Sequence, residues 1–111
     1  IFCYHGEPRA IQVDVDRHTK HRRRLYTNTW QPLPFAYNKP LAPIEEKPAM
    51  FDEALRLARA VAKHFPFFRV DVYLTHDRVL MGELTSIPEN AHGRFEPLNA
   101  ERQFMKLLTG S

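Results

Sequence analysis

The fold of this chain is decided by two neighbouring segments: Phe67-Phe68-Arg69-Val70-Asp71-Val72-Tyr73 and Val79-Leu80-Met81-Gly82-Glu83-Leu84-Thr85. Both segments are rich in β-branched and aromatic residues, which favour strands. The short polar stretch between them, residues 75–78, is typical of a hairpin turn. The sequence therefore predicts an antiparallel pair of strands over residues 67–85.

Polar side chains alternate with apolar ones along this predicted pair. Because successive side chains of a strand point to opposite faces, Arg69, Asp71 and Tyr73 share one face. Glu83 and Thr85 share one face of the partner strand. If the two faces coincide, a guanidinium group, two carboxylates and a hydroxyl group meet on a small area of sheet. Divalent cations and phosphates bind such groups.

Spacing alone leaves two interpretations of these polar residues open. Acids on paired strands are commonly solvated or salt-bridged, and that structural role is the simpler interpretation. Two details favour a functional role. Asp71 lies between Val70 and Val72 on a strand whose other face is apolar, and Gly82 lies inside a predicted strand, where glycine often marks close approach by a ligand or another backbone.

The other segments predict an α+β fold, in which an antiparallel sheet has a helix packed on one face. Strands are expected at 1–5 and 9–16, joined by a turn at residues 5–8 that contains glycine and proline. Residues 50–64 form the best helix, since apolar residues recur there at helical spacing. Those residues are Ala54, Leu55, Ala58, Val61, Ala62 and Phe65.

Two further stretches complete the predicted organisation. Residues 28–49 contain five prolines and are expected to cross the surface as a loop, pinned by Trp30, Phe35 and Tyr37. Residues 86–97 form a second loop, and residues 98–108 form a short terminal helix.

Composition places the chain among ordinary globular proteins. Its 111 residues suffice for a single domain, and 43% of them are hydrophobic while 26% are charged. No apolar run approaches the roughly 18 residues of a membrane span, and we expect no signal peptide. The single Cys3 excludes an internal disulfide and fits a reducing compartment. The chain opens on an apolar strand-like run at residues 1–4, from which we expect residues 1–111 to be one part of a longer protein.

A basic run at residues 17–24 follows the second predicted strand, and the chain has a net charge of +3. Beside Asp14 and Asp16, this run could hold an acidic small-molecule or polymer substrate, with Arg17 as its first cation. It could instead form a small basic module that binds nucleic acid or an anionic polymer, although the lack of interleaved aromatic residues argues against nucleic acid. A solvated loop is the third interpretation.

The order of several motifs resembles one branch of the ATP-grasp enzymes. The motifs are Phe-Pro-Phe-Phe-Arg-Val-Asp-Val-Tyr at 65–73, Gly-Glu-Leu-Thr at 82–85 and Gly-Arg-Phe-Glu-Pro at 93–97, together with residues 11–17, residues 30–35 and Lys47-Pro48 ahead of the helix. Their spacing is similar to that of the C-terminal portion of TupA-like proteins, the branch named for teichuronopeptide biosynthesis. The resemblance covers nearly the whole chain.

The resemblance implies a role for each polar residue of the strand pair. Asp71 and Glu83 become ligands of Mg²⁺, and Arg69 becomes the catalytic residue beside the transferred phosphoryl group, so that these three residues also hold the cofactor ATP. Thr85 takes the place of the usual asparagine as a third metal ligand. A threonine at this position departs from the superfamily pattern. Its hydroxyl group can still offer an oxygen to Mg²⁺, but it is a weaker ligand.

The implied reaction is the ATP-dependent activation of a carboxylate as an acyl phosphate, which a nucleophile then attacks. The resemblance further implies a bacterial, cytoplasmic ligase of cell-surface polysaccharide or peptide-polymer biosynthesis. Its nucleotide-binding lysines would lie in the remainder of the ATP-grasp domain, and we expect residues 1–111 alone to be inactive. A glycosyltransferase-type polysaccharide biosynthesis protein remains an alternative.

Overall fold

Short strands form two separate sheets in the computed structural model, which describes residues 1–15, 20–86, 95–96 and 100–109. The strands are β1 (Phe2–Tyr4), β2 (Glu7–Val15), β3 (Arg22–Thr27), β4 (Ala36–Tyr37), β5 (Phe67–Leu74), β6 (Val79–Ser86) and β7 (Phe95–Glu96), and the helices are α1 (Phe51–Ala62) and α2 (Ala100–Thr109).

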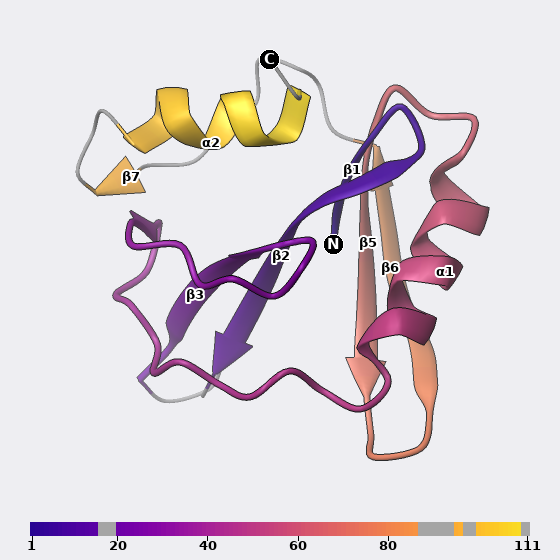
Figure 1. Cartoon of the computed structure of the whole chain (residues 1–111), viewed down its shortest axis with the longest axis horizontal. Coiled ribbons are helices and arrows are strands. Elements are labelled where there is room, and N and C mark those ends of the chain that lie inside the picture. Colours follow the sequence, from indigo (N-terminus) through magenta and orange to yellow (C-terminus); the bar gives the residue numbers. More distant parts are fainter. Residues whose placement is uncertain (16–19, 87–94, 97–99, 110–111) are drawn as a thin grey trace.

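The main sheet has five strands in the order β3-β2-β1-β5-β6, and every neighbouring pair is antiparallel. Strands β4 and β7 form a second, two-stranded antiparallel sheet. Figure 1 shows α1 lying along the β5–β6 hairpin and α2 crossing the opposite end of the molecule. This arrangement confirms the predicted α+β class, an antiparallel sheet with packed helices, and it is consistent with the C-terminal subdomain of an ATP-grasp fold.

The first hairpin turns more tightly than the sequence predicts. Only His5 and Gly6 lie between β1 and β2, and both have positive φ angles, 49° and 84°. Two left-handed residues in succession match the right-handed twist of the flanking strands, which is why glycine is favoured here. The predicted four-residue turn is therefore wrong: Glu7 and Pro8 belong to β2, and Pro8 is fully buried.

Strand β3 is the main departure from the prediction, because the sequence pattern predicts no strand over residues 22–27. Residues 22–27 instead pair with β2, from Val15↔Arg22 to Ala10↔Thr27. The pairing buries Leu25 and Tyr26 almost completely, with exposed fractions of 1% and 0%. Burial of these two side chains outweighs the preference of the charged neighbours for solvent.

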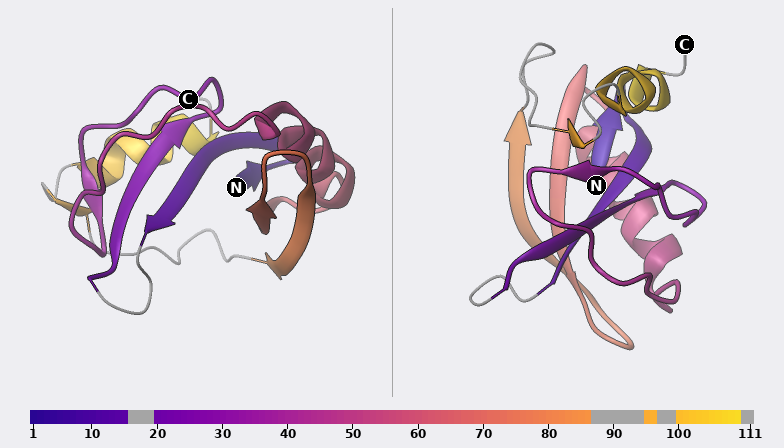
Figure 2. Two further views of the ribbon diagram at one scale, coloured as in Figure 1. Left: turned by 90° about the horizontal axis from the view of Figure 1, so that it is seen from below. Right: turned by 90° about the vertical axis from the view of Figure 1, so that its left-hand side faces the viewer.

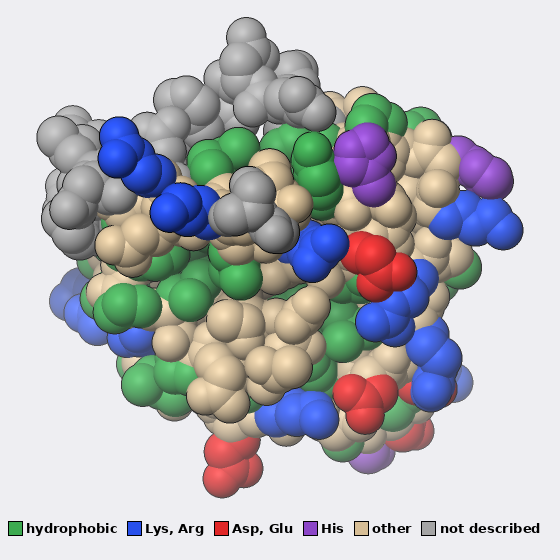
Figure 3. Space-filling view, turned by 45° about the horizontal axis from the view of Figure 1, so that its top comes forward, with side chains coloured by type: hydrophobic (Ala, Val, Ile, Leu, Met, Phe, Trp, Pro, Cys, Tyr) green, Lys and Arg blue, Asp and Glu red, His purple; other side chains and the backbone are tan. Residues whose placement is uncertain are grey.

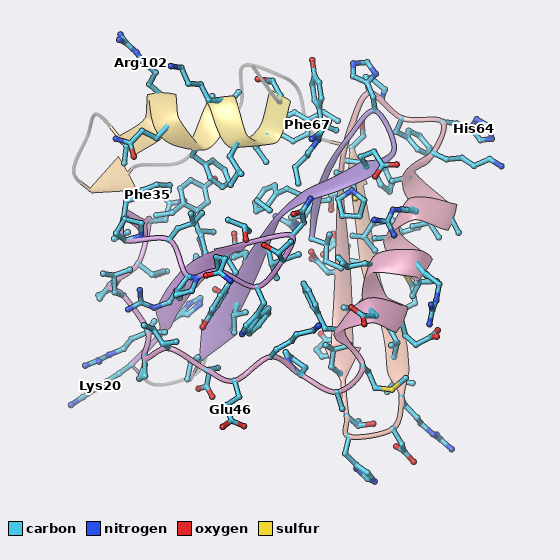
Figure 4. The ribbon with its side chains drawn as sticks, in the orientation of Figure 1. Lys20, Phe35, Glu46, His64, Phe67 and Arg102 are labelled. Atoms are coloured by element: carbon cyan, nitrogen blue, oxygen red, sulfur yellow. The ribbon has the colours of Figure 1, made fainter. Side chains whose placement is uncertain are left out.

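Two hydrophobic clusters lie on opposite faces of the main sheet. Side chains of Phe68 and Val70 pack with those of α1, whereas Phe67 packs with those of α2. Since successive residues of a strand point to opposite faces, each helix covers one face; we call them the α1 face and the α2 face. Figure 4 shows Phe67 and Phe35 on the α2 side, while Lys20, Glu46 and Arg102 project outward.

Helix α1 is shorter than the predicted 50–64 and buries most of the expected residues, while Val61 is only partly buried. Ala54, Leu55, Ala58 and Ala62 are buried on the sheet. The prediction for Phe65 is wrong, because the helix ends at Ala62 and Phe65 stacks on Phe68 with 41% of its surface exposed. No helix in the described part of the chain is long and apolar enough to cross a membrane.

The proline-rich loop is pinned by aromatic residues, as predicted. Trp30 stacks on Tyr26 at 4.0 Å between ring centroids, and its indole nitrogen donates a hydrogen bond to the carbonyl oxygen of Glu45. Phe35 is buried and Tyr37 stacks on Phe104 of α2. These contacts hold the loop against both clusters, and Figure 2 shows it following the twisted sheet, with β2 and β3 crossing β5 and β6 at a steep angle.

Candidate functional site

The two faces of the strand pair coincide. Arg69 of β5 pairs directly with Thr85 of β6, and Val70 pairs with Leu84. Val70 is fully buried in the α1 cluster, so its neighbours Arg69 and Asp71 point to the other face, the one that carries α2. Thr85 shares that face because it is the partner of Arg69. The convergence that the sequence left conditional is therefore present.

Arg69 and Asp71 form a bidentate ion pair along one strand. Nε of Arg69 donates to Oδ1 of Asp71 at 2.9 Å, and the terminal nitrogen Nη2 donates to Oδ2 at 3.1 Å. About a third of each side chain is exposed, 34% for Arg69 and 37% for Asp71. The pair is thus reachable from solvent, and an exposed ion pair of this kind costs little to open.

Thr85 and Glu83 complete the group with unused oxygens. The hydroxyl oxygen of Thr85 is buried and has no hydrogen-bond partner within the described residues. Glu83 is exposed, and it forms no ion pair within the described residues. A buried hydroxyl group without a partner is uncommon, since it loses its water without compensation, and it marks a place where a ligand or an ordered water belongs.

A magnesium ion fits this donor set. Mg²⁺ binds through one or two carboxylates and completes its shell with phosphate oxygens and water, so a dense cage of protein ligands is not needed. Asp71 and Glu83 offer the carboxylates, and Thr85 offers the buried oxygen. Groups of three or more His, Cys, Asp or Glu side chains that could hold a metal are absent from the described residues, which excludes a dense site there.

The carboxylate of Asp14, the first of the predicted substrate residues, is already hydrogen-bonded to side chains of the fold. Its Oδ1 accepts hydrogen bonds from Nε of Arg23 at 2.6 Å and from His21 at 3.0 Å, and its Oδ2 accepts one from Gln12 at 3.1 Å. Burial alone would raise the pKa of Asp14, but the hydrogen bonds from Arg23, His21 and Gln12 outweigh it, and the pKa lies below its usual value.

Asp14 nevertheless shares the face of Arg69 and Asp71. Its neighbours Ile11 and Val13 pack with α1, so Asp14 points to the α2 face, on the far side of β1 from β5. Sequence reasoning missed its partner Arg23, because three consecutive arginines and two adjacent buried residues show no clear alternation over residues 22–27. The remaining predicted substrate residues, Asp16 and Arg17, lie outside the described residues.

The arginines of β3 are largely committed to the fold. Arg24 donates to the carbonyl oxygens of Ala42 and Leu33, and Arg23 is bonded to Asp14 and packs over the ring of Tyr37. Arg22 is exposed. Figure 3 shows acidic and basic side chains intermixed on the face in view. These contacts weaken the interpretation of residues 17–24 as a basic binding module.

Cys3 is a core residue of β1. It is fully buried in the α1 cluster, and burial raises the pKa of its thiol to about 11. A thiol that stays protonated at neutral pH and cannot be reached by solvent is not a nucleophile. The reactive groups of the site are therefore those on β5 and β6.

One comparison with known proteins identifies a family. The family model described as "TupA-like ATPgrasp" matches residues 1–107, almost the whole chain. No curated protein and no solved structure matches the chain.

Proposed function

The chain belongs to the TupA-like ATP-grasp family, and on that premise we propose that it carries the magnesium- and phosphate-binding end of an ATP-dependent, carboxylate-activating ligase. The observation that carries the proposal is the group on β5 and β6: the solvent-reachable Arg69–Asp71 pair and, directly opposite Arg69, the Thr85 hydroxyl, which has no hydrogen-bond partner among the described residues. The fold accounts for where these side chains lie, but it does not depend on their charged and hydroxyl groups.

Each residue of the group has a role that its chemistry supports. Asp71 and Glu83 provide carboxylate oxygens for Mg²⁺, and Thr85 adds a hydroxyl oxygen that lacks any other described partner. Mg²⁺, when bound, would neutralise charge on the nucleotide phosphates. Arg69 stabilises the negative charge of the transferred phosphoryl group, because phosphoryl transfer depends mainly on positioning and electrostatics.

Arg69 and Asp71 engage only part of each other's bonding capacity, because an arginine has five N–H donors and a carboxylate about four lone pairs. Both hydrogen bonds of the pair, 2.9 Å and 3.1 Å, use groups that would face the phosphate and the cation. The structure therefore represents the site with Arg69 and Asp71 paired to each other. Opening this pair is inexpensive because both side chains are partly hydrated already, and an exposed pair contributes at most about 1 kcal/mol.

The proposed reaction has two steps. The γ-phosphoryl group passes from ATP to an oxygen of a substrate carboxylate, which releases ADP, and a nucleophile then displaces phosphate from the acyl carbon. We place this ligase in the bacterial cytoplasm, in the synthesis of a cell-surface polysaccharide or peptide polymer. The family membership supports the reaction class, and the finer assignment to the teichuronopeptide branch belongs to the proposal.

We further propose that residues 1–111 are the C-terminal part of a larger ATP-grasp domain. The family resemblance assigns the nucleotide-binding lysines and the adenine pocket to the remainder of that domain. The chain alone should accordingly bind Mg²⁺ and ATP weakly and turn over nothing. Measurable ATP hydrolysis by the pure 111-residue chain would contradict this part of the proposal.

The decisive experiment supplies the protein, expressed from its complete reading frame, with either ATP or a nucleotide sugar. A ligase consumes ATP in the presence of Mg²⁺ and leaves the nucleotide sugar intact, whereas the reverse result would establish a glycosyltransferase. Asp71→Asn and Glu83→Gln should each abolish ATP consumption. Wild-type activity in both variants would overturn the assignment of the site.

A further inference from the structure

Strand β6 contains one residue more than β5 can pair with. Near the turn the register joins Val72 to Met81, but two residues later it joins Val70 to Leu84. Asp71 is therefore opposed by two residues of β6, Gly82 and Glu83. This two-against-one count defines a β-bulge, a feature that bends a strand and changes the direction of a side chain.

The bulge decides which side chains reach the site. If the register set by the turn continued without it, Glu83 would pair with Val70 on the α1 face, and Thr85 would lie on that face too. With the bulge, alternation from Leu84 places Glu83 on the α2 face, together with Asp71 and Arg69. The extra residue thus turns both predicted ligands of β6 toward the ion pair.

Only glycine fits at the bulge. A Cβ atom built on Gly82 would lie 2.9 Å from the carbonyl oxygen of Asp71 and 3.1 Å from the ring of Tyr73. The first distance is shorter than real Cβ contacts, and the atom approached is backbone, which cannot yield without moving the strand. Gly82 therefore allows a close approach by the backbone of β5. The approach is made at Asp71, which carries one of the carboxylates of the site.

We infer that Gly82 is a positioning residue, whose bulge holds Glu83 beside Asp71 but not directly across from it, so that the two carboxylates can share one cation. Like charges placed directly opposite each other on paired strands repel. The offset lets both carboxylates face the same space while avoiding that opposition. This inference rests on the proposed function, because the cation is the Mg²⁺ assigned there.

The test measures binding of Mn²⁺, a paramagnetic substitute for Mg²⁺, to the 111-residue chain. In the wild-type protein, Mn²⁺ should broaden the backbone amide resonances of both Asp71 and Glu83. In Gly82→Ala, the affinity should fall about tenfold, the loss typical when a residue that orients a metal ligand is changed. The broadening at Glu83 should fall relative to that at Asp71.

A second variant and a control separate positioning from folding. Deleting Gly82 removes the bulge and places Glu83 directly opposite Asp71, so the broadening at Glu83 relative to that at Asp71 should depart from the wild-type pattern, even if Gly82→Ala does not fold. Met81→Ala, the neighbouring residue on the α1 face, should leave the broadening pattern unchanged. A purely structural role for Gly82 would lower the melting temperature without altering which resonances broaden.

Two results would overturn the inference, and they are distinguishable from each other. If wild-type protein binds Mn²⁺ and both Gly82 variants keep its affinity and pattern, the positioning role fails while the proposed function stands. If wild-type protein binds no Mn²⁺, the proposed site fails and the inference fails with it. Cross-strand nuclear Overhauser contacts between Val70 and Leu84 check the bulge itself without any metal.

Discussion

The α2 face of the sheet carries an aspartate beside an arginine twice, and the two pairs have different surroundings. Asp14 and Arg23 are partners across β2 and β3, with exposed fractions of 21% and 14%. Asp71 and Arg69 lie on the single strand β5, with 37% and 34% exposed. The residue types are identical, but one pair is closed into the fold and the other is open to solvent.

The difference lies in how completely each carboxylate is satisfied. Asp14 accepts hydrogen bonds from three side chains, and its arginine also packs over Tyr37. Within the described residues, the side chain of Asp71 is bonded to Arg69 alone, and the Thr85 hydroxyl opposite Arg69 has no hydrogen-bond partner. A fully satisfied pair fixes a hairpin, whereas a pair with a single partner can exchange that partner for a ligand.

The largest expected effect concerns catalysis by the open pair. Replacing Arg69 by alanine in the complete protein should lower the rate of Mg²⁺-dependent ATP consumption by about a thousandfold, the lower range for a charge-stabilising arginine in phosphoryl transfer. Steady-state assays of ADP release would measure it. Asp52→Asn, an exposed aspartate of α1, is the control and should keep full activity. An Arg69→Ala enzyme with wild-type turnover would remove the open pair from the mechanism.

The next effect should separate the two pairs by stability. Asp14→Ala should lower the free energy of unfolding by about 2 kcal/mol, because it removes charge-assisted hydrogen bonds and leaves Arg23 partly buried without its carboxylate. Asp71→Ala, the matched substitution in the exposed pair, should cost under about 1 kcal/mol. Urea unfolding of both variants gives the two values. The reverse order would show that Asp71 and Arg69, and not Asp14 and Arg23, form the structural pair.

A smaller effect should appear in anion binding without metal. Asp71→Asn releases Arg69 from its ion pair, so affinity for inorganic tripolyphosphate should rise about twofold to fivefold, matching the small free energy of an exposed pair. Titration calorimetry on the 111-residue chain measures this change. Asp14→Asn should leave tripolyphosphate affinity at the wild-type value, since Arg23 stays packed against Tyr37. Weaker binding to Asp71→Asn would contradict a resting state in which Asp71 holds Arg69 away from anions.

The smallest effect is a pH dependence that arises from Asp14 of the closed pair. Because the pKa of Asp14 is lower in the folded protein than its ordinary value of 3.8, its carboxylate stabilises the fold above that pH. This contribution disappears as the pH falls through 3.8 toward the lower folded value. Between pH 5 and pH 3, wild-type protein should therefore lose more unfolding free energy than Asp14→Asn. Equal losses in urea titrations would contradict the assigned cause.

Local patterns predicted the strands that carry the open pair. Strands at 67–73 and 79–85 and the turn between them were confirmed, because their apolar residues alternate and the turn is short and polar. The closed pair was missed, since three consecutive arginines hide the alternation that makes residues 22–27 a strand. The role of Thr85 as a buried, unpartnered hydroxyl depends on packing around it, which no local pattern records.

The sequence by itself determined the secondary structure around the site, the alternation that puts Arg69 and Asp71 on one face, and the family. Only the tertiary structure decided that Glu83 and Thr85 join that face, and that Asp14 is closed into the fold. The physical reason is the same in both cases. Alternation is a property of one strand, whereas register, bulges and ion pairs depend on which strand lies alongside and on how closely its backbone approaches.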